Sequence, residues 1–103
     1  MEVKGWENGS GDNETGSGYG VKLSPEDRER WFEREWSSVI LHIEGGDEVH
    51  VNVSQSFWRG CPELRHRRIG QFLVAEGLAP WKKRKPPRVK LEPLGGRHFR
   101  LSR

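Results

Sequence analysis

The sequence predicts a small α+β domain in which two helices pack against two antiparallel hairpins, in the order α-β-β-α-β-β. Apolar residues alternate with polar ones in two pairs of short runs, and glycines separate the members of each pair. A segment with helix start or stop signals precedes each pair. With 103 residues, of which 32% are hydrophobic, the chain can build one thin core, so we expect a single domain.

Residues 1–21 are predicted to be a disordered, glycine-rich tail in front of a basic α+β domain at residues 22–103. Six glycines lie between Met1 and Gly20 without an apolar period, so little surface is available to offset the entropy of ordering. The N-terminus is acidic, unlike a signal peptide, and no run has the length of a membrane span. We expect a cytoplasmic or nucleoid protein, or a nuclear one in a eukaryote, without membrane contact.

The first helix is predicted to run from Pro25 to about Trp36. Ser24 suits the N-cap position and proline suits the first helical position. The aromatic residues Trp31, Phe32 and Trp36 fall on one face at helical spacing, and this pattern is more typical of a core than of a platform for stacking bases. We therefore expect all three rings in the core.

A hairpin is predicted over Ser38–Ser54, because its six apolar side chains can share one face. That register pairs Ile43 with Val49 around a three-residue loop and sets His42 opposite His50. Two histidines across a hairpin could bind a divalent metal. An exposed strand face also accommodates histidines freely, so no metal and no other cofactor is assigned.

The second helix is predicted over Pro62–Gly77, with the glycine as a left-handed stop. Ile69, Phe72 and Leu73 share the face expected in the core. The opposite face carries arginine and glutamine, which can form paired hydrogen bonds with base edges in a major groove, although they are also ordinary surface residues.

The second hairpin is predicted over Arg88–Arg103, with Leu94-Gly95-Gly96 as its loop. In this register Lys90 lies directly opposite Arg100 on the outward face. Because like charges across a hairpin are destabilising, an anion bound between them would remove that cost.

Charge is distributed unevenly along the chain. Residues 1–58 hold 5 Lys/Arg against 12 Asp/Glu, whereas residues 59–103 hold 13 against 3. A basic half of this kind favours polyanionic partners, although folding could also bring the two halves together and neutralise them. The single cysteine, Cys61, excludes an internal disulfide.

The strongest functional signal is Pro80–Lys90, where a tryptophan and four consecutive basic residues lie between prolines. Proline favours extended backbone, which spreads the charges along a line for phosphate contacts, and a tryptophan can stack on a base. The run could also be a solvated loop or a localisation signal. The residues assigned to nucleic-acid contact are Arg67, Arg68, Gln71, Trp81, Lys82, Lys83, Arg84, Lys85, Arg88, Lys90 and Arg100.

We therefore expect a non-catalytic domain that binds DNA or RNA, with DNA preferred, through one basic face. The main alternative is a protein-interaction module that binds an acidic partner or supports a complex, and a metal-dependent nuclease is a minor alternative.

Two outlines resemble known families. The helix at Pro62–Gly77 and the basic hairpin after it resemble the second half of a winged-helix DNA-binding domain, in which the hairpin is the wing. The Val39–Val53 hairpin occupies the place of an expected helical turn, so no residue roles are transferred. The order of a hairpin that carries His42 followed by a helix that carries His66 resembles the ββα-metal nucleases. The Asn and Asp positions usual in that family have no counterpart in this sequence.

Overall fold

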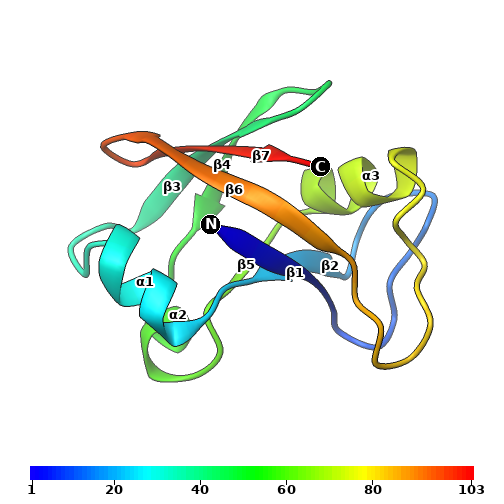
Figure 1. The fold of residues 1–103 in the computed structure, drawn as a ribbon, viewed down its shortest axis with the longest axis horizontal. Coiled ribbons are helices and arrows are strands. Elements are labelled where there is room, and N and C mark those ends of the chain that lie inside the picture. Colours follow the sequence, from blue (N-terminus) through cyan, green and yellow to red (C-terminus); the bar gives the residue numbers. More distant parts are fainter.

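A computed structural model describes residues 1–103 and shows one seven-stranded sheet accompanied by three short helices (Figure 1). The α+β class and the single domain are as predicted, but the strands form one continuous sheet instead of two separate hairpins on helices. The elements in chain order are β1 (Glu2–Glu7), β2 (Tyr19–Lys22), α1 (Pro25–Trp31), β3 (Ser38–Ile43), β4 (Glu48–Asn52), α2 (Gln55–Arg59), β5 (Glu63–Arg65), α3 (Arg67–Ala75), β6 (Arg88–Gly95) and β7 (His98–Ser102).

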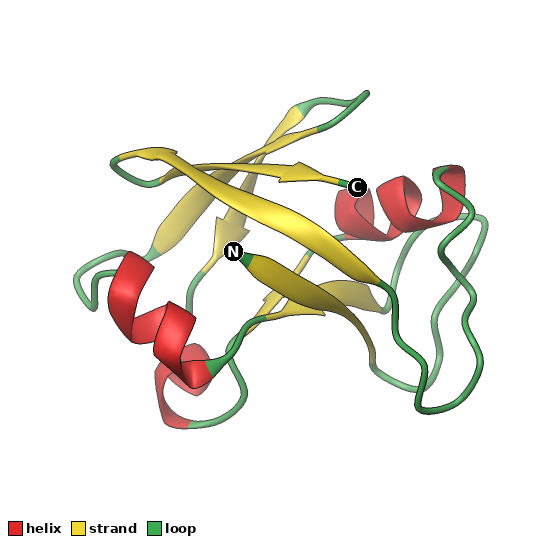
Figure 2. Ribbon diagram, in the orientation of Figure 1, coloured by secondary structure: helices red, strands yellow, loops and turns green.

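The strand order across the sheet is β4-β3-β7-β6-β1-β2-β5, with β3 and β7 parallel and every other neighbouring pair antiparallel. The sheet curls so strongly that its two edge strands, β4 and β5, approach one another (Figure 2). The apolar core lies inside this curl, and its buried residues include no charged side chain. The charged side chains that could contact a ligand therefore all lie outside the core.

The N-terminal residues are part of the sheet, which differs from the disordered tail expected over residues 1–21. β1 lies between β6 and β2, and Val3 and Tyr19 are only 1% and 2% exposed. All of the glycines that suggested disorder except Gly9 are positions of close approach instead. A Cβ atom on Gly5 would lie 2.9 Å from the ring of Pro87, and one on Gly20 would clash with the Leu64 carbonyl oxygen of β5.

Helix α1 begins as predicted, because the Ser24 hydroxyl accepts a hydrogen bond from the Asp27 N–H at 3.1 Å. It ends at Trp31, five residues earlier than expected, because Phe32 adopts extended backbone. This turn carries the Phe32 ring into the core, where it stacks on Phe99 with a centroid separation of 4.7 Å. Trp31 stays 38% exposed, so its expected place in the core is wrong.

The β3–β4 hairpin forms, but its register is shifted by two residues from the prediction. Leu41 pairs with Val49, and a four-residue turn replaces the expected three-residue loop. The turn is held by the Gly46 N–H, which donates to the Ile43 carbonyl oxygen at 2.9 Å. Because a shift of two preserves the strand face, all six apolar side chains are still buried.

The segment predicted as one helix over Pro62–Gly77 divides into β5 and α3. Leu64 is fully buried opposite Val21 of β2, so pairing with the N-terminal strand takes these residues from the helix. The predicted core residues Ile69, Phe72 and Leu73 are all buried. Gly77 has φ +71° and ends the helix as expected. Helix α2, five residues long, forms where only a turn was expected.

The β6–β7 hairpin is also shifted by two residues. Leu91 pairs with Leu101, and an irregularity between Pro93 and Gly95 leads into a shorter turn. Lys90 therefore lies opposite Ser102, and Arg100 lies opposite Glu92, so the predicted Lys90–Arg100 repulsion is absent.

The winged-helix outline also fails at this hairpin. The hairpin lies in the middle of the sheet between β1 and β3 and is not a projecting wing. No helix of the structure has the length and apolar character to cross a membrane.

Candidate nucleic-acid interface

A basic hollow of about 550 Å³ lies where β1 and β2 meet the loop at residues 80–87. Two indole rings, Trp6 and Trp81, line it, and Glu7 is its single carboxylate. We call it the Trp6 hollow. The cations that line it are Lys4, Lys22, Lys83 and Arg84. Two of these come from the N-terminal residues and two from the basic run, so folding joins the two parts of the sequence.

Strand alternation explains why lysines gather on the outer face of β1. Val3 points into the core, and its neighbour Lys4 therefore points outward. In the sheet register Lys4 lies opposite Arg88 of β6 on one side and opposite Lys22 of β2 on the other. Three cations thus stand in a row across three strands. Like charges directly opposite are destabilising, so a bound anion here would relieve repulsion.

Trp6 is half-buried and projects from the same outer face. The guanidinium carbon of Arg65 lies 4.6 Å from the indole centroid, and the Glu63 carboxylate holds Arg65 at 2.6 Å. A second hollow of about 330 Å³, lined by Trp6, Arg65 and Arg67 among others, adjoins the indole. Trp6 therefore borders both hollows, and cations line each of them.

Trp81 anchors the base of the loop at residues 80–87. Its ring packs 5.5 Å from the ring of Tyr19 and lies beside Gly5, where a Cβ atom would come within 3.1 Å of it. Burial, followed by the charges of Glu7 and Asp12, raises the pKa of the Tyr19 hydroxyl.

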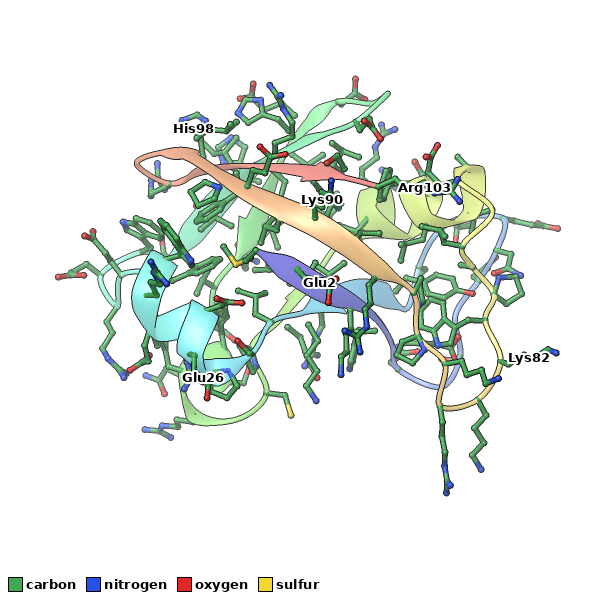
Figure 3. All side chains as sticks on the ribbon, in the orientation of Figure 1. Glu2, Glu26, Lys82, Lys90, His98 and Arg103 are labelled. Atoms are coloured by element: carbon green, nitrogen blue, oxygen red, sulfur yellow. The ribbon has the colours of Figure 1, made fainter.

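The tip of this loop carries four exposed cations, Lys82 to Lys85. A turn forms there, since the Lys85 N–H donates to the Lys82 carbonyl oxygen at 3.0 Å. Arg84 has φ +65°, an uncommon backbone conformation for a residue other than glycine. Lys82 extends away from the body of the protein (Figure 3).

The structure brings only part of the predicted contact set together. Trp81, Lys83 and Arg84 line the Trp6 hollow, Arg67 lines the adjoining one, and Arg88 lies beside Lys4. Lys82 and Lys85 stand at the exposed loop tip. Lys90 lies opposite Glu2 of β1 in the sheet register, so its neighbour across the strands is an acidic residue.

The remaining predicted residues lie elsewhere, near acidic side chains. Arg68 lies 3.6 Å from the Asp47 carboxylate and donates to the Gln71 side chain at 3.3 Å. The Gln71 amide in turn donates to the Thr15 carbonyl oxygen at 3.0 Å. Arg100 lies opposite Glu92 and lines a hollow that also holds carboxylates of the β3–β4 hairpin.

Sequence reasoning missed four residues of this surface: Lys4, Trp6, Lys22 and Arg65. The first three fall in or next to the expected tail. The alternation of inward valine and outward lysine at Val3-Lys4 and Val21-Lys22 was a usable strand signal, but the surrounding glycines masked it.

The histidines are arranged differently from the prediction as well. The two-residue register shift sets His42 opposite Glu48, with the ring 3.8 Å from that carboxylate, and His50 opposite Ile40. The partner of His42 is His98 of β7, at 2.9 Å between ring nitrogens.

His66 precedes α3, and its Nδ1 accepts a hydrogen bond from the Arg68 N–H at 3.0 Å. Burial lowers the pKa of this histidine, and the neighbouring Arg67 and Arg68 lower it further. Its neutral ring therefore serves as the helix cap.

Comparison of the chain with protein-family models, with curated proteins and with solved structures finds no match. Function is therefore inferred from the charge and geometry of the site itself.

Proposed function

We propose that the protein binds nucleic acid, without catalysis, through the Trp6 hollow and the basic loop beside it. The observation that carries the proposal is the row of Arg88, Lys4 and Lys22 across three neighbouring strands, next to two indole rings. Cations of this density match a phosphate backbone, and indoles match the faces of bases. DNA is the first ligand to test.

The electrostatic part of the site is accessible. Lys4, Lys22 and Lys83 are exposed and have no ion-pair partner, so each can contact a phosphate without losing an internal salt bridge. Arg88 is paired with Glu2 at 2.8 Å, but both side chains are exposed and the pair is weak enough to exchange for a phosphate. The proposal therefore needs no rearrangement of the fold.

Salt dependence gives a quantitative test, because each neutralised phosphate releases counterions. If four cations contact phosphates, the slope of log affinity against log salt is about −2.8 for a single strand and about −3.6 for a duplex. Affinity for a labelled oligonucleotide, measured by fluorescence anisotropy, should then fall roughly 50- to 150-fold between about 50 mM and 200 mM salt.

A pair of double variants localises the effect. Lys22→Gln with Lys83→Gln should reduce the magnitude of the slope by about 1.4 to 1.8. Arg30→Gln with Arg59→Gln removes the same charge from α1 and α2, at the opposite end of the molecule (Figure 1), and should leave the slope nearly unchanged. No binding at low salt, or equal effects of the two double variants, would overturn the proposal.

The competing hypothesis is that the surface binds an acidic protein, and polyglutamate serves as a model of such a partner. If polyglutamate displaces the oligonucleotide at equal charge concentration, the surface recognises charge alone and the nucleic-acid proposal fails.

A further inference from the structure

Helix α3 is the longest helix, and the loop between β1 and β2 covers part of its surface, whereas Arg67 and Arg68 stay exposed. The loop between β1 and β2 crosses it at Gly16, where the two backbones touch. A Cβ atom on Gly70 would clash with the Gly16 carbonyl oxygen and lie 2.7 Å from the Gly16 Cα. The neighbouring Gln71 side chain donates a hydrogen bond to the Thr15 carbonyl oxygen of this loop. Of the predicted base-reading side chains, Gln71 is therefore already engaged within the protein, so α3 offers less for base readout than the sequence suggested.

The Trp6 hollow, by contrast, suits a base that is not paired or stacked in a duplex. In a duplex the faces of each base are covered by its neighbours, whereas a single strand can turn a base face toward an aromatic ring. Trp6 lies at the border of two hollows of about 550 Å³ and 330 Å³, with Arg65 already packed on the ring. The indole is thereby held in place before any ligand arrives, which lowers the entropy cost of stacking.

The cations around Trp6 are placed to hold the phosphates that flank such a base. Lys4 and Lys22 lie on neighbouring strands on one side, and Arg65 and Arg67 lie beside the second hollow. A chain that ran across β1 would meet basic side chains before and after the indole. The cations and the Trp6 indole are therefore arranged along one short line, as a single strand requires, and are not spread over a broad flat surface.

We propose that the ligand is single-stranded nucleic acid with one base stacked on Trp6, an inference that rests on the proposed function above. The shared chemistry is a sugar-phosphate chain with an exposed base, and single-stranded DNA and RNA both supply it. The loop at residues 80–87 closes the hollow on the side of Trp81, and the curved outer face of β1 and β2 forms its floor.

The test uses labelled probes of one length, about 12 nucleotides, within the range that small single-strand binding domains cover. They are a single-stranded DNA, its duplex, the matching RNA strand, and the DNA strand with its central bases removed as abasic sites. The DNA or RNA strand should bind at least tenfold more tightly than the duplex. The abasic strand should lose roughly 5- to 150-fold, the usual effect of losing one base–aromatic stack.

Variants of the indole connect this loss to Trp6. Trp6→Leu should weaken binding to the intact strand by the same factor, leave binding to the abasic strand unchanged, and keep the salt slope. Trp6→Phe retains a ring and should recover most of the affinity, and Trp31→Leu at the other end of the molecule is the matched control. Circular dichroism melting of each variant verifies that it is folded.

Two results would overturn the inference in distinguishable ways. If duplex and single strand bind equally, with full salt dependence and no loss for the abasic strand, stacking on Trp6 is wrong while the proposed function stands. If no probe binds at low salt, the proposed function fails as well. The abasic comparison needs no variant, so it is decisive even if Trp6→Leu does not fold.

Discussion

Replacing Gly70 by alanine should destabilise the protein, although the residue is inside a helix. Alanine normally improves a helix interior by about 1 kcal/mol relative to glycine. In α3 the added Cβ would overlap the Gly16 carbonyl oxygen and approach two further backbone atoms of Gly16 to 2.7 Å. The β1–β2 loop would have to move outward, and the hydrogen bond from Gln71 to Thr15 would stretch or break.

The expected net effect is a loss of stability of about 1–3 kcal/mol. Overpacking typically costs about 1–3 kcal/mol, and the lost hydrogen bond adds about 1 kcal/mol, which together outweigh the gain in helix propensity. In a domain of this size each kcal/mol lowers the melting temperature by roughly 4–8 °C. Urea denaturation followed by tryptophan fluorescence measures the free energy of unfolding directly.

Gly46→Ala is the matched control, because a Cβ there would have no neighbour nearer than 3.8 Å and the backbone has no positive φ. Its stability should equal that of the unchanged protein. If Gly70→Ala is as stable as this control, the N-terminal loop does not rest on α3.

Three further predictions test the fold and its helix cap. Deleting residues 1–7 removes β1 from between β6 and β2, so the amide spectrum should lose the dispersion of a folded protein; a well-dispersed spectrum would contradict the described topology. Leu41→Ala should cost about 2–5 kcal/mol in urea denaturation, because Leu41 is fully buried on the central face of β3, and a loss under 1 kcal/mol would contradict that burial. The lowered pKa of His66 means that its neutral form stabilises the fold above its ordinary pKa of 6.5, and this contribution is lost as the pH falls through the lowered folded pKa. His66→Asn supplies a cap that does not titrate, so it should flatten this part of the pH dependence, and an unchanged pH profile would show that His66 does not contribute to it.

Local signals predicted the elements whose partners lie nearby in sequence. Ser24 marked the start of α1, Gly77 marked the end of α3, and the alternation of β3 and β4 fixed which face is buried. The registers were wrong by two residues, because turn length depends on hydrogen bonds such as that from Gly46 to Ile43, and a shift of two leaves the apolar pattern unchanged.

The features that could not be predicted from the sequence depend on pairing between strands that are far apart in the chain. β1 has few apolar residues and is ordered by β6, which is more than 80 residues away in the sequence. Gly5 and Gly20 lower local propensity, yet they allow Pro87 and Leu64 to approach the backbone. The same pairing makes the candidate site, since Lys4 and Lys22 meet the basic loop only after the sheet forms. The basic run was therefore recognised from the sequence, whereas Trp6 was not.

The five tryptophan indoles provide the most direct test of the proposed interface. Trp6 and Trp81 line the basic hollow, whereas Trp36 and Trp58 pack around Phe32 and Phe57 near Trp31, at the end of the molecule that holds α1 and α2. Nitrogen-15 spectra resolve each indole N–H during titration with a single-stranded oligonucleotide. We predict that the Trp6 and Trp81 signals shift on binding while the other three stay in place. Shifts confined to the other three, or none at saturating oligonucleotide, would contradict the proposed interface.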